Sequence, residues 1–344
     1  MLNSSTPPLV SVVIPHYGGK DIIYDCLESL KKVTYSNIEI IVVDNNSPDD
    51  SIEYIKKEYP NIKLVVSSYN RGFAGGCNYG VKESLGKYIL ILNNDTTHES
   101  DFIDFLVNKL ESNKNISSVQ PKIKNFSNSL YFDYAGACGG FIDKYCFPFA
   151  RGRIFNTIEE DIGQYDNSCK IFWASGTAFL TRAEKFNQIG GFDEVLFAHM
   201  EEIDFHWKSQ ILGYEVWVEP KSVIFHKGAV TLPASSPKKT FLNFRNSLIL
   251  LLTNNSKIRI LSIILPRILF ECLALIKQVV SLKWGHGLSI FRSWIWIFKN
   301  LNFLKQRREF YNINKTKVQM LTYNKSIVIK YFLQRKKYFN KIFY

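Results

Sequence analysis

The chain has 344 residues, of which 46% are hydrophobic, and this composition excludes an intrinsically disordered protein. A chain of this length is expected to form about two structural units, since a typical domain has ~150 residues. The charge is unevenly distributed: residues 241–344 contain 19 Lys and Arg against Glu271 and Glu309, a net charge of +17, whereas residues 1–240 have a net charge of −5. The sequence therefore predicts a mildly acidic domain followed by a strongly basic region whose partner is negatively charged.

The first 112 residues alternate between short apolar segments and amphipathic segments, a pattern that predicts strands followed by helices. The expected strands are residues 9–14, 38–43, 63–66 and 88–92. The expected helices have apolar positions at Ile23, Leu27, Leu30 and Val33; at Ile52, Ile55 and Tyr59; at Cys77, Val81 and Leu85; and at Phe102, Phe105, Leu106 and Leu110. Asp21 is expected to cap the first helix, and Gly86 to end the third. This alternation predicts an α/β fold with a mostly parallel sheet and helices on both of its faces.

The middle of the chain is less regular. We expect loops and short strands at 120–170, an apolar stretch at 171–180, a helix near 201–212 and a strand near 215–218. The sequence TLPASSPKK at 231–239 predicts a linker or loop, so residues 233–240 mark the expected boundary between the two units.

The basic region is rich in apolar residues, but charged side chains interrupt every long apolar run. The interrupting residues are Arg259, Arg267, Glu271 and Lys277 in the first apolar stretch and Arg292 in the second. No uncharged run approaches the ~20 residues that a membrane-spanning helix needs. Trp284, Trp294 and Trp296 lie beside Lys and Arg, which is typical of helices that lie in a membrane interface. The alternative is an ordinary helical subdomain that packs on the sheet.

The N-terminus and the cysteines indicate a reducing location. Residues 1–8 lack the charged and apolar segments of a secretory signal peptide, so we expect a cytosolic protein. None of the six cysteines forms a CxxC pair, which argues against a zinc site. Their scattered spacing in a long chain also argues against a disulfide framework. We therefore expect reduced thiols that are mostly buried.

Polar clusters follow three of the four predicted strands. They are Pro15-His16-Tyr17, Asp44-Asn45-Asn46-Ser47 and Asn93-Asn94-Asp95-Thr96. A single cluster of this kind fits a helix cap or a turn equally well. In a parallel sheet, however, ligands bind outside the carboxyl ends of the strands, so these three clusters are expected to meet in one crevice.

A glycine-rich segment, Asn70-Arg71-Gly72-Phe73-Ala74-Gly75-Gly76-Cys77-Asn78, joins the third predicted strand to its helix. Its glycines allow the backbone to approach a ligand closely, and the start of the helix favours an anion. The spacing of Gly72, Gly75 and Gly76 does not match the GxGxxG fingerprint, and the segment does not follow the first strand. These differences argue against a dinucleotide-dependent oxidoreductase.

Three acidic residues, Glu201, Glu202 and Asp204, fall in the first turn of the helix near 201–212. Ile203, Trp207 and Ile211 recur at helical spacing and are expected to form the buried face of that helix. Glu202 shares a different face with His206, four residues later. Acidic residues in a first turn also complement the helix dipole, so their presence alone does not identify catalytic groups.

Eight short segments follow one another in a specific order over roughly residues 9–232. They are VSVVIPHY, IIVVDNNS, NRGFAGGCNYG, ILILNNDT, WASGTAFLTR, IGGFDE, HMEEIDFHWK and VIFHKGAVT. Their order and spacing resemble the family 2 inverting glycosyltransferases, especially rhamnosyltransferase-like bacterial members. The resemblance implies a GT-A fold, a Rossmann-like α/β glycosyltransferase domain over residues 9–232.

The resemblance also implies roles for residues of the donor site. Pro15, Tyr17 and Asp44 would hold the nucleotide base and ribose. Asn70, Gly72, Gly75 and Asn78 would line the sugar-nucleotide pocket, to which Asn93 and Asn94 also belong. Asp95 matches the last Asp of the DxD metal motif, whose first Asp is Asn93 here, and His226 matches the histidine that closes over the metal and the diphosphate.

The acidic turn would supply the catalytic base. Glu202 matches the Asp of the usual Glu-Asp pair, so this chain has a base longer by one methylene group. Glu201 and Asp204 are the competing candidates, and Glu202 and Asp204 also remain possible as a pair of catalytic carboxylates, since sequence alone does not separate them. An acceptor hydroxyl is a poor nucleophile at neutral pH and needs a carboxylate within hydrogen-bonding reach.

Together these observations predict an inverting, metal-dependent glycosyltransferase that uses magnesium or manganese. Its donor would be a nucleotide sugar of rhamnose or another hexose, and its acceptor a saccharide, lipid-linked, in the synthesis of a cell-surface polysaccharide. Residues 241–344 would attach the protein peripherally to the anionic inner face of the cell membrane. The alternative is a non-catalytic sugar-nucleotide or membrane-binding module on the same fold. A nucleic-acid partner is not expected, because the Trp, Leu and Ile of the basic region suit lipid better than a phosphate groove.

Overall fold

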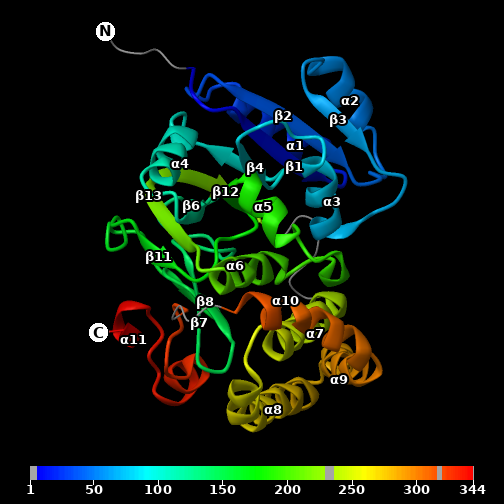
Figure 1. The fold of residues 1–344 in the computed structure, drawn as a ribbon, viewed down its shortest axis with the longest axis vertical. Helices are drawn as coiled ribbons and strands as arrows, with labels where there is room; N and C mark the ends of the chain where they lie inside the picture. Colours follow the sequence, from blue (N-terminus) through cyan, green and yellow to red (C-terminus); the bar gives the residue numbers. More distant parts are fainter. Residues whose placement is uncertain (1–5, 229–235, 316–319, 344) are drawn as a thin grey trace.

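The computed structural model describes residues 6–228, 236–315 and 320–343 (Figure 1). Its largest element is a nine-stranded sheet with the order β11-β13-β6-β12-β4-β1-β2-β3, and the short strand β5 pairs with β13 beside this path. The strands are β1 (Val10–His16), β2 (Ile38–Asp44), β3 (Lys63–Val66), β4 (Tyr88–Leu92), β5 (Thr96–His98), β6 (Ile116–Asn125), β11 (Cys169–Ile171), β12 (Ala178–Arg182) and β13 (Glu215–His226). Two of the predicted strands, at 63–66 and 88–92, have the observed bounds.

The first four strands form a parallel half of the sheet. Strand β1 pairs in parallel with β2 and β4, and β2 pairs in parallel with β3. Strands β6 and β13 are also parallel, whereas β12 runs antiparallel between β4 and β6. The short edge strands β5 and β11 run antiparallel to β13. The predicted α/β fold with a mostly parallel sheet is confirmed.

Helices cover both faces of this sheet. On one face lie α1 (Lys20–Leu30), α2 (Ser51–Glu58) and α4 (Phe102–Glu111), whose apolar residues share a core with Val12, Val42 and Leu90. On the other face lie α3 (Gly72–Val81), α5 (Ala183–Ile189) and α6 (Glu201–Ile211), which share a core with residues such as Val13, Val43 and Ile91. Successive residues of a strand point to opposite faces, so neighbouring strand residues belong to different cores.

Two predicted helix boundaries are wrong. Helix α1 begins at Lys20 after Gly19, which has a φ of 92°, so Asp21 lies inside the first turn and does not cap the helix. Helix α3 begins at Gly72 and ends at Val81, and Leu85, expected on its apolar face, is 80% exposed beyond its end. The glycine-rich segment therefore forms most of this helix instead of a loop before it.

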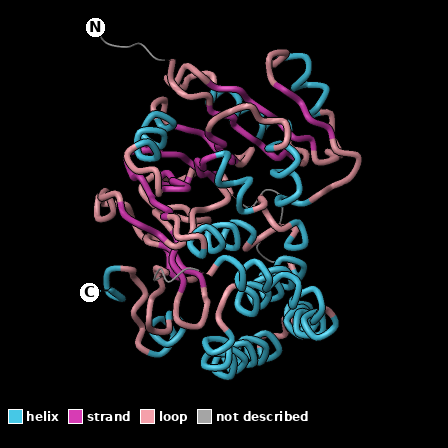
Figure 2. Tube along the Cα trace, in the orientation of Figure 1, coloured by secondary structure: helices cyan, strands magenta, loops and turns pink. Residues whose placement is uncertain are grey.

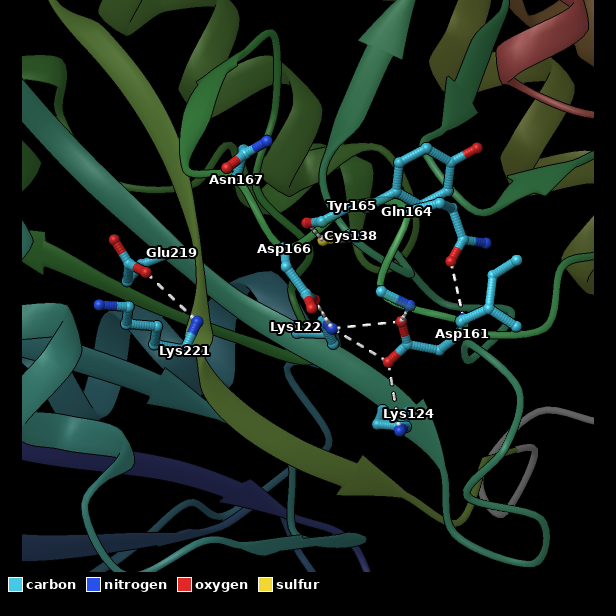
Figure 3. Close-up of polar contacts among 12 residues, drawn as sticks. Lys122, Lys124, Cys138, Asp161, Gln164, Tyr165, Asp166, Asn167, Glu219 and Lys221 are labelled. Carbon is cyan, nitrogen blue, oxygen red and sulfur yellow. Dashed lines mark hydrogen bonds and ion pairs between the residues drawn. The ribbon is translucent and has the colours of Figure 1, made fainter.

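The irregular segment predicted at 120–170 contains a small antiparallel sheet with the order β10-β9-β8-β7. Its strands are β7 (Gly140–Ile142), β8 (Pro148–Ala150), β9 (Arg153–Ile154) and β10 (Thr157–Ile158). The loop that follows is joined to β6 by ion pairs, which Figure 3 shows. Lys122 Nζ lies 3.0 Å from Asp161 Oδ2 and 2.5 Å from Asp166 Oδ1, and Lys124 Nζ lies 3.2 Å from Asp161 Oδ2. These ion pairs fix the loop against the end of the main sheet.

The basic region forms helices α7 (Pro237–Thr253), α8 (Lys257–Val280), α9 (Trp284–Lys299) and α10 (Leu301–Asn314). They gather at one end of the molecule, where α7 and α10 contact each other and α10 contacts α6 (Figure 2). A π-helical turn, η2 (Ile329–Leu333), and α11 (Asn340–Phe343) follow. Part of the predicted linker, 233–235, lies outside the described residues, while 237–240 belong to α7. In the described parts of the chain, no helix combines the length and the apolar character that crossing a bilayer requires.

Helix α8 has one ion pair inside and many apolar residues outside. Arg267 and Glu271, each 1% exposed, form an ion pair of 2.9 Å. Leu261 and Leu265, by contrast, are 75% and 74% exposed. Two of the four charges predicted to interrupt the apolar stretch therefore point into the protein, whereas Lys277 is exposed. Trp294 also points inward, since its Nε1 donates to Glu271 Oε2 at 2.6 Å.

All six cysteines are free, as predicted, and four of them are buried. The exceptions are Cys169 and Cys272, which are partly exposed. Burial raises the pKa of the Cys26 thiol to about 12, so it stays protonated at neutral pH.

Candidate active site

The three polar clusters meet at the carboxyl ends of the parallel strands, as predicted. His16 at the end of β1 lies opposite Asp44 at the end of β2 in the parallel register. Asn94, which follows β4, donates from Nδ2 to His16 Nδ1 at 2.9 Å. Asp44 is buried, and its Oδ1 accepts a hydrogen bond from the Ser47 N–H at 2.8 Å. The aromatic ring of Tyr17, 41% exposed, follows His16 and is open to a ligand.

His16 is a structural residue that the sequence did not identify. Burial lowers its pKa to about 4, so the imidazole is neutral at pH 7. Asn94 donates to Nδ1, which leaves the Nε2–H to donate to Ser51 Oγ at 2.8 Å. The Asn94 amide, predicted to contact the nucleotide, is thus engaged in joining two strand ends.

The glycines after β3 are required by contacts within the protein. Gly72 has a φ of 70°, and a Cβ there would lie 2.4 Å from the carbonyl oxygen of Phe197. A Cβ at Gly75 would lie 2.7 Å from the Arg71 Cβ. We expected these glycines to admit a ligand, whereas the observed neighbours are the protein's own atoms. Because Gly72 and Gly75 have no side chains, the segment 194–197 can pack directly on α3.

Asn45 and Asn70 hold the start of the glycine-rich segment in place by hydrogen bonds. Asn45 Oδ1 accepts from the Arg71 N–H at 2.9 Å, and its Nδ2 donates to the Gly72 carbonyl at 2.8 Å. Asn70 Oδ1 accepts from the Gly72 N–H at 2.8 Å. Asn78 bonds to both main-chain groups of Phe192, at 2.8 and 2.9 Å, so its amide anchors a neighbouring loop. Asn45 was not among the predicted site residues, and Pro15 lies beside it, against Gly76.

Asp95 and His226 come together from β4 and β13. His226 Nε2 lies 3.2 Å from Asp95 Oδ1, and both residues are 5% exposed. Asp95 Oδ1 is buried, and this contact lacks the geometry of a hydrogen bond. On the other side of the ring, His226 Nδ1 lies 2.9 Å from Asp133 Oδ1. Burial opposes a charge on the imidazole, but the hydrogen bond to Asp133 and the negative charge of the adjacent Asp95 outweigh it and raise the pKa of His226 to about 10.

Asp133 is a site residue that sequence reasoning missed. It lies 93 residues before His226, in the segment predicted to be irregular. Its N–H donates to the Ile123 carbonyl at 2.9 Å, which places it beside β6. A carboxylate bound to Nδ1 of a histidine orients Nε2 toward a metal in many proteins. Within the described ranges, no three His, Cys, Asp or Glu side chains form a metal-binding group, because Asp133 and Asp95 contact opposite sides of the ring.

Both main-chain groups of Asn93 form hydrogen bonds within the protein. Its N–H donates to the Thr177 carbonyl at 2.9 Å, and its carbonyl accepts from Thr96 Oγ1 at 2.9 Å. The residue therefore fixes the turn that presents Asp95 after β4.

The loop before α6 has a strained backbone. Phe197, His199 and Met200 have φ values of 65°, 67° and 73°, which cost about 1–3 kcal/mol for each residue. Helix α7 stabilises this loop: Asn246 Nδ2 donates to the carbonyls of Leu196, Ala198 and His199 at 2.9, 3.2 and 2.7 Å. The loop in turn sets the position at which α6 begins.

The three acids of α6 have different surroundings. Glu201 is buried, and burial together with the nearby Glu202 raises its pKa well above the usual value, which keeps it protonated. Glu202 is partly exposed, and desolvation raises its pKa to about 7. Asp204 Oδ2 lies 2.6 Å from Arg307 Nη2 and 2.8 Å from Lys208 Nζ. Burial alone would raise the pKa of Asp204, but Arg307 and Lys208 lower it well below the usual value.

The predicted buried face of α6 is confirmed, since Ile203, Trp207 and Ile211 are all less than 5% exposed. His206, expected on an open face with Glu202, is also buried. Its Nδ1 lies 2.7 Å from the main-chain oxygen of Glu202, and its ring packs against Phe179. His206 therefore contacts the backbone of Glu202 and not the carboxylate.

The segment that carries most of these residues matches a known family. The family model described as glycosyl transferase family 2 matches residues 11–190. The chain belongs to this family. The resemblance found in the sequence is confirmed, and the predicted GT-A fold is supported by the solved structures described below.

Curated relatives match parts of the chain. An N-acetylglucosaminyl-diphospho-decaprenol L-rhamnosyltransferase of Mycobacterium tuberculosis is 24% identical over 60% of this chain and 72% of its own length. A UDP-Glc:alpha-D-GlcNAc-diphosphoundecaprenol beta-1,3-glucosyltransferase of Escherichia coli is 40% identical over 28% of this chain and 41% of its own length. A poly-beta-1,6-N-acetyl-D-glucosamine synthase of Staphylococcus epidermidis is 25% identical over 62% of this chain and 48% of its own length. The chain thus spans about half the length of several of these relatives.

Two solved structures have a similar fold. GalNAc-T7, solved with UDP, GalNAc and Mn2+, gives a TM-score of 0.58 at 17% identity and covers 73% of this chain and 48% of its own. TarS of S. aureus gives a TM-score of 0.51 at 18% identity and covers 75% of this chain and 43% of its own. At these identities the similarity establishes the GT-A fold.

Proposed function

We propose that this family member is an inverting, metal-dependent glycosyltransferase in which Glu202 is the catalytic base. The observation that carries the proposal is the difference among the three acids of α6. Glu202 is partly exposed with a pKa near 7, whereas Glu201 is buried and protonated and Asp204 is held by Arg307. A general base is most effective when its pKa lies near the working pH, and only Glu202 meets that condition.

The donor would bind at the ends of β1, β2 and β4. The exposed ring of Tyr17 offers a stacking surface for the base, and the Asp44 carboxylate offers an acceptor for ribose hydroxyls. The sugar, rhamnose or another hexose, would then extend toward α6. The diphosphate would lie near Asp95 and His226.

Asp95 and His226 fit a divalent metal, because Asp95 Oδ1 is buried without a hydrogen-bond partner and faces His226 Nε2. Asp133 would hold the proton on Nδ1, while Nε2 would lose its proton to become a ligand. A bound magnesium or manganese ion would neutralise the charge that develops on the leaving diphosphate. With only two protein ligands, the diphosphate oxygens and water would complete the coordination.

Transfer needs one carboxylate on the acceptor side. Glu202 would take the proton of the acceptor hydroxyl as that oxygen forms a bond to the anomeric carbon and the bond to the diphosphate breaks. Attack opposite the leaving group inverts the anomeric centre. Hydrolysis by two carboxylates would require a second free acid, and Asp204 is occupied by Arg307 and Lys208.

The acceptor would be a lipid-linked saccharide at the cytoplasmic face of a membrane, in the synthesis of a cell-surface polysaccharide. Two relatives are named for acceptors on diphospho-polyprenol lipids. Helices α8 and α9 expose apolar residues, among them Leu265, Leu269 and Phe298, next to basic side chains. Exposed apolar patches of this kind mark sites of membrane or protein interaction.

The experiment that tests the function is turnover of a panel of nucleotide sugars by the full-length protein, read as release of nucleoside diphosphate. We expect one donor to be consumed, faster with a saccharide acceptor present. Donor binding without turnover of any donor would favour the non-catalytic alternative, a sugar-nucleotide-binding module.

Metal removal gives a prediction with the same assay. Turnover should be lost in excess EDTA and restored by magnesium or manganese. Asp95→Asn should nearly abolish turnover, since it removes the charged ligand, and His226→Ala should reduce it less. Full activity in EDTA would contradict the proposed metal dependence.

A further inference from the structure

A cavity of about 490 Å³ lies between the small sheet, helices α7 and α8 and the η2 turn. Pockets of ~300–1,000 Å³ are large enough for small-molecule ligands. Its walls are mostly apolar, with Phe147 and Phe155 from the small sheet, Phe244 from α7 and Phe270 from α8. Val328 and Phe332 close the opposite side. The composition of these walls favours an apolar ligand.

Two of the three charged residues of the lining, Arg267 and Glu271, are already bonded within the protein, and the third, Lys277, is exposed. Arg267 donates to Glu271 Oε1 at 2.9 Å, to Ser247 Oγ at 2.7 Å and to the carbonyl of Tyr145 at 3.0 Å. The remaining Glu271 oxygen accepts from Trp294 at 2.6 Å. Because these buried polar atoms are already bonded, a hydrocarbon chain beside them breaks no hydrogen bond.

The cavity connects two regions that the proposed function needs to bring together. Leu273, on its rim, is 54% exposed and belongs to the apolar outer face of α8. Phe332, across the rim, is 53% exposed. At another point the lining includes Met200, the residue immediately before Glu201 and Glu202 in the strained loop. The cavity therefore extends from the apolar surface of α8 to the start of the helix that carries the base.

We propose that this cavity binds the hydrocarbon chain of the lipid-linked acceptor and so directs the sugar end of that acceptor toward Glu202. The proposal rests on the proposed function, and it names the acceptor's chemical class: a saccharide joined to a long, unbranched or isoprenoid chain. Continuity with the exposed face of α8 favours this occupant, because Leu273 belongs both to the lining of the cavity and to that apolar face. Each methylene group buried should raise affinity by roughly fourfold, so chain length should control affinity.

The test uses full-length protein and saccharide acceptors joined through a diphosphate to alkyl chains of increasing length. For the wild type, kcat/KM should rise by roughly tenfold or more between a chain-free acceptor and a long-chain acceptor. Ala274→Trp fills the cavity from α8 and should abolish this rise while donor hydrolysis and turnover of the chain-free acceptor persist. Leu85→Trp is the matched control, since it adds the same ring at a position that is 80% exposed in the N-terminal domain and outside the cavity lining. It should behave like the wild type.

A second variant and a direct probe distinguish a loss of chain binding in the cavity from misfolding of a single variant. Ile329→Trp fills the cavity from the opposite wall and should have the same effect as Ala274→Trp. A polyprenyl diphosphate with a photoreactive group at the chain end should label cavity residues, and either tryptophan variant should lose that label. Equal kcat/KM for all chain lengths, or labelling confined to the outer face of α8, would overturn the inference while leaving transfer intact. Labelling of the cavity without turnover of any donor would instead overturn the proposed function and support the ligand class.

Discussion

At the scale of single residues, Glu202 has a carboxyl group in a position where ionisation is costly. Desolvation raises its pKa from 4.5 to about 7, so the folded protein disfavours the ionised form that catalysis requires. Below pH 4.5 the Glu202 carboxyl is protonated in both the folded and the unfolded protein, so its raised pKa costs no stability. As pH rises from 4.5 through 7, the carboxyl ionises more readily in the unfolded protein, and the free energy of unfolding falls. A base that is ready for a proton at neutral pH thus destabilises the fold.

Glu202→Gln removes this cost. We predict that the variant is more stable than the wild type at pH 8, by on the order of 2 kcal/mol, and equally stable at pH 4. Urea unfolding followed by circular dichroism at the two pH values measures the difference. Glu53→Gln, at an exposed position of α2, is the control and should be neutral at both. Equal stability of Glu202→Gln and the wild type at pH 8 would show that the carboxyl is not desolvated.

Also at this scale, the limits of sequence reasoning are visible in Asp133. Asp95, His226 and Glu202 could be located because each occupies a motif with fixed neighbours. Asp133 has no such motif, and its contact with His226 depends on how a segment without periodicity folds back beside β6. The bonds of Asn78 to Phe192 could not be predicted for a related reason, because they bridge 114 residues of sequence.

At the scale of elements, α6 and α10 are joined by one guanidinium group. Arg307 Nη2 lies 2.6 Å from Asp204 Oδ2, and its Nε lies 2.6 Å from Asp193 Oδ2. Asn254, at the end of α7, donates to the other Asp204 oxygen at 2.7 Å. Asp204 therefore holds α6 against the C-terminal helices, which explains its acidic side chain without a role in proton transfer.

Arg307→Gln removes one counter-charge from the buried Asp204, which keeps Lys208, and the ion-pair partner of the partly buried Asp193. We expect a loss of about 3 kcal/mol in the free energy of unfolding, since removal of one partner of a buried ion pair leaves charge without its partner. Lys305→Gln, an exposed position on the same helix, should change stability by no more than about 0.5 kcal/mol. Chemical unfolding of both variants checks this. A loss in Arg307→Gln as small as in Lys305→Gln would mean that the ion pairs contribute little.

Periodicity located most elements but not the orientation of α8. The alternation of strands and helices identified β3, β4 and α4 because their apolar residues repeat at regular intervals. In α8 the usual relation is inverted: Arg267 and Glu271 neutralise each other inside, which no pattern of single residues reveals. Helix α3 was misplaced because glycines, poor helix formers, make up its first turns for packing reasons.

At the scale of the whole molecule, the two halves of the chain are distinct in charge yet packed together. The predicted boundary separates a domain of net charge −5 from a region of +17. In the structure, α7 supports the loop before α6 and α10 bonds to α6 itself. The C-terminal helices are therefore part of the framework of the candidate active site, and α8 and α9 keep exposed apolar residues on their outer surfaces.

Membrane attachment is predicted to depend on the outer face of α8. Full-length protein should sediment with vesicles that contain anionic lipid at low salt. Replacement of Leu265 and Leu269 by Glu should prevent this, because it places charge on the apolar surface that contacts lipid. Leu85→Glu, at a position that is 80% exposed in the N-terminal domain, should sediment like the wild type. Wild-type protein that stays in the supernatant at low salt would contradict the proposed attachment.

The measurement that tests the account most directly compares turnover in Glu202→Gln, Glu201→Gln and Asp204→Asn. Loss of a general base lowers the rate by ~10²–10⁴-fold, so Glu202→Gln should show this loss in kcat with donor affinity near that of the wild type. Wild-type kcat should fall as pH decreases below about 7, following the pKa of Glu202. The other two variants should lose less turnover or act through stability. If Glu202→Gln keeps most of its turnover while Asp204→Asn, correctly folded, does not, the base is Asp204 and the assignment of Glu202 is wrong.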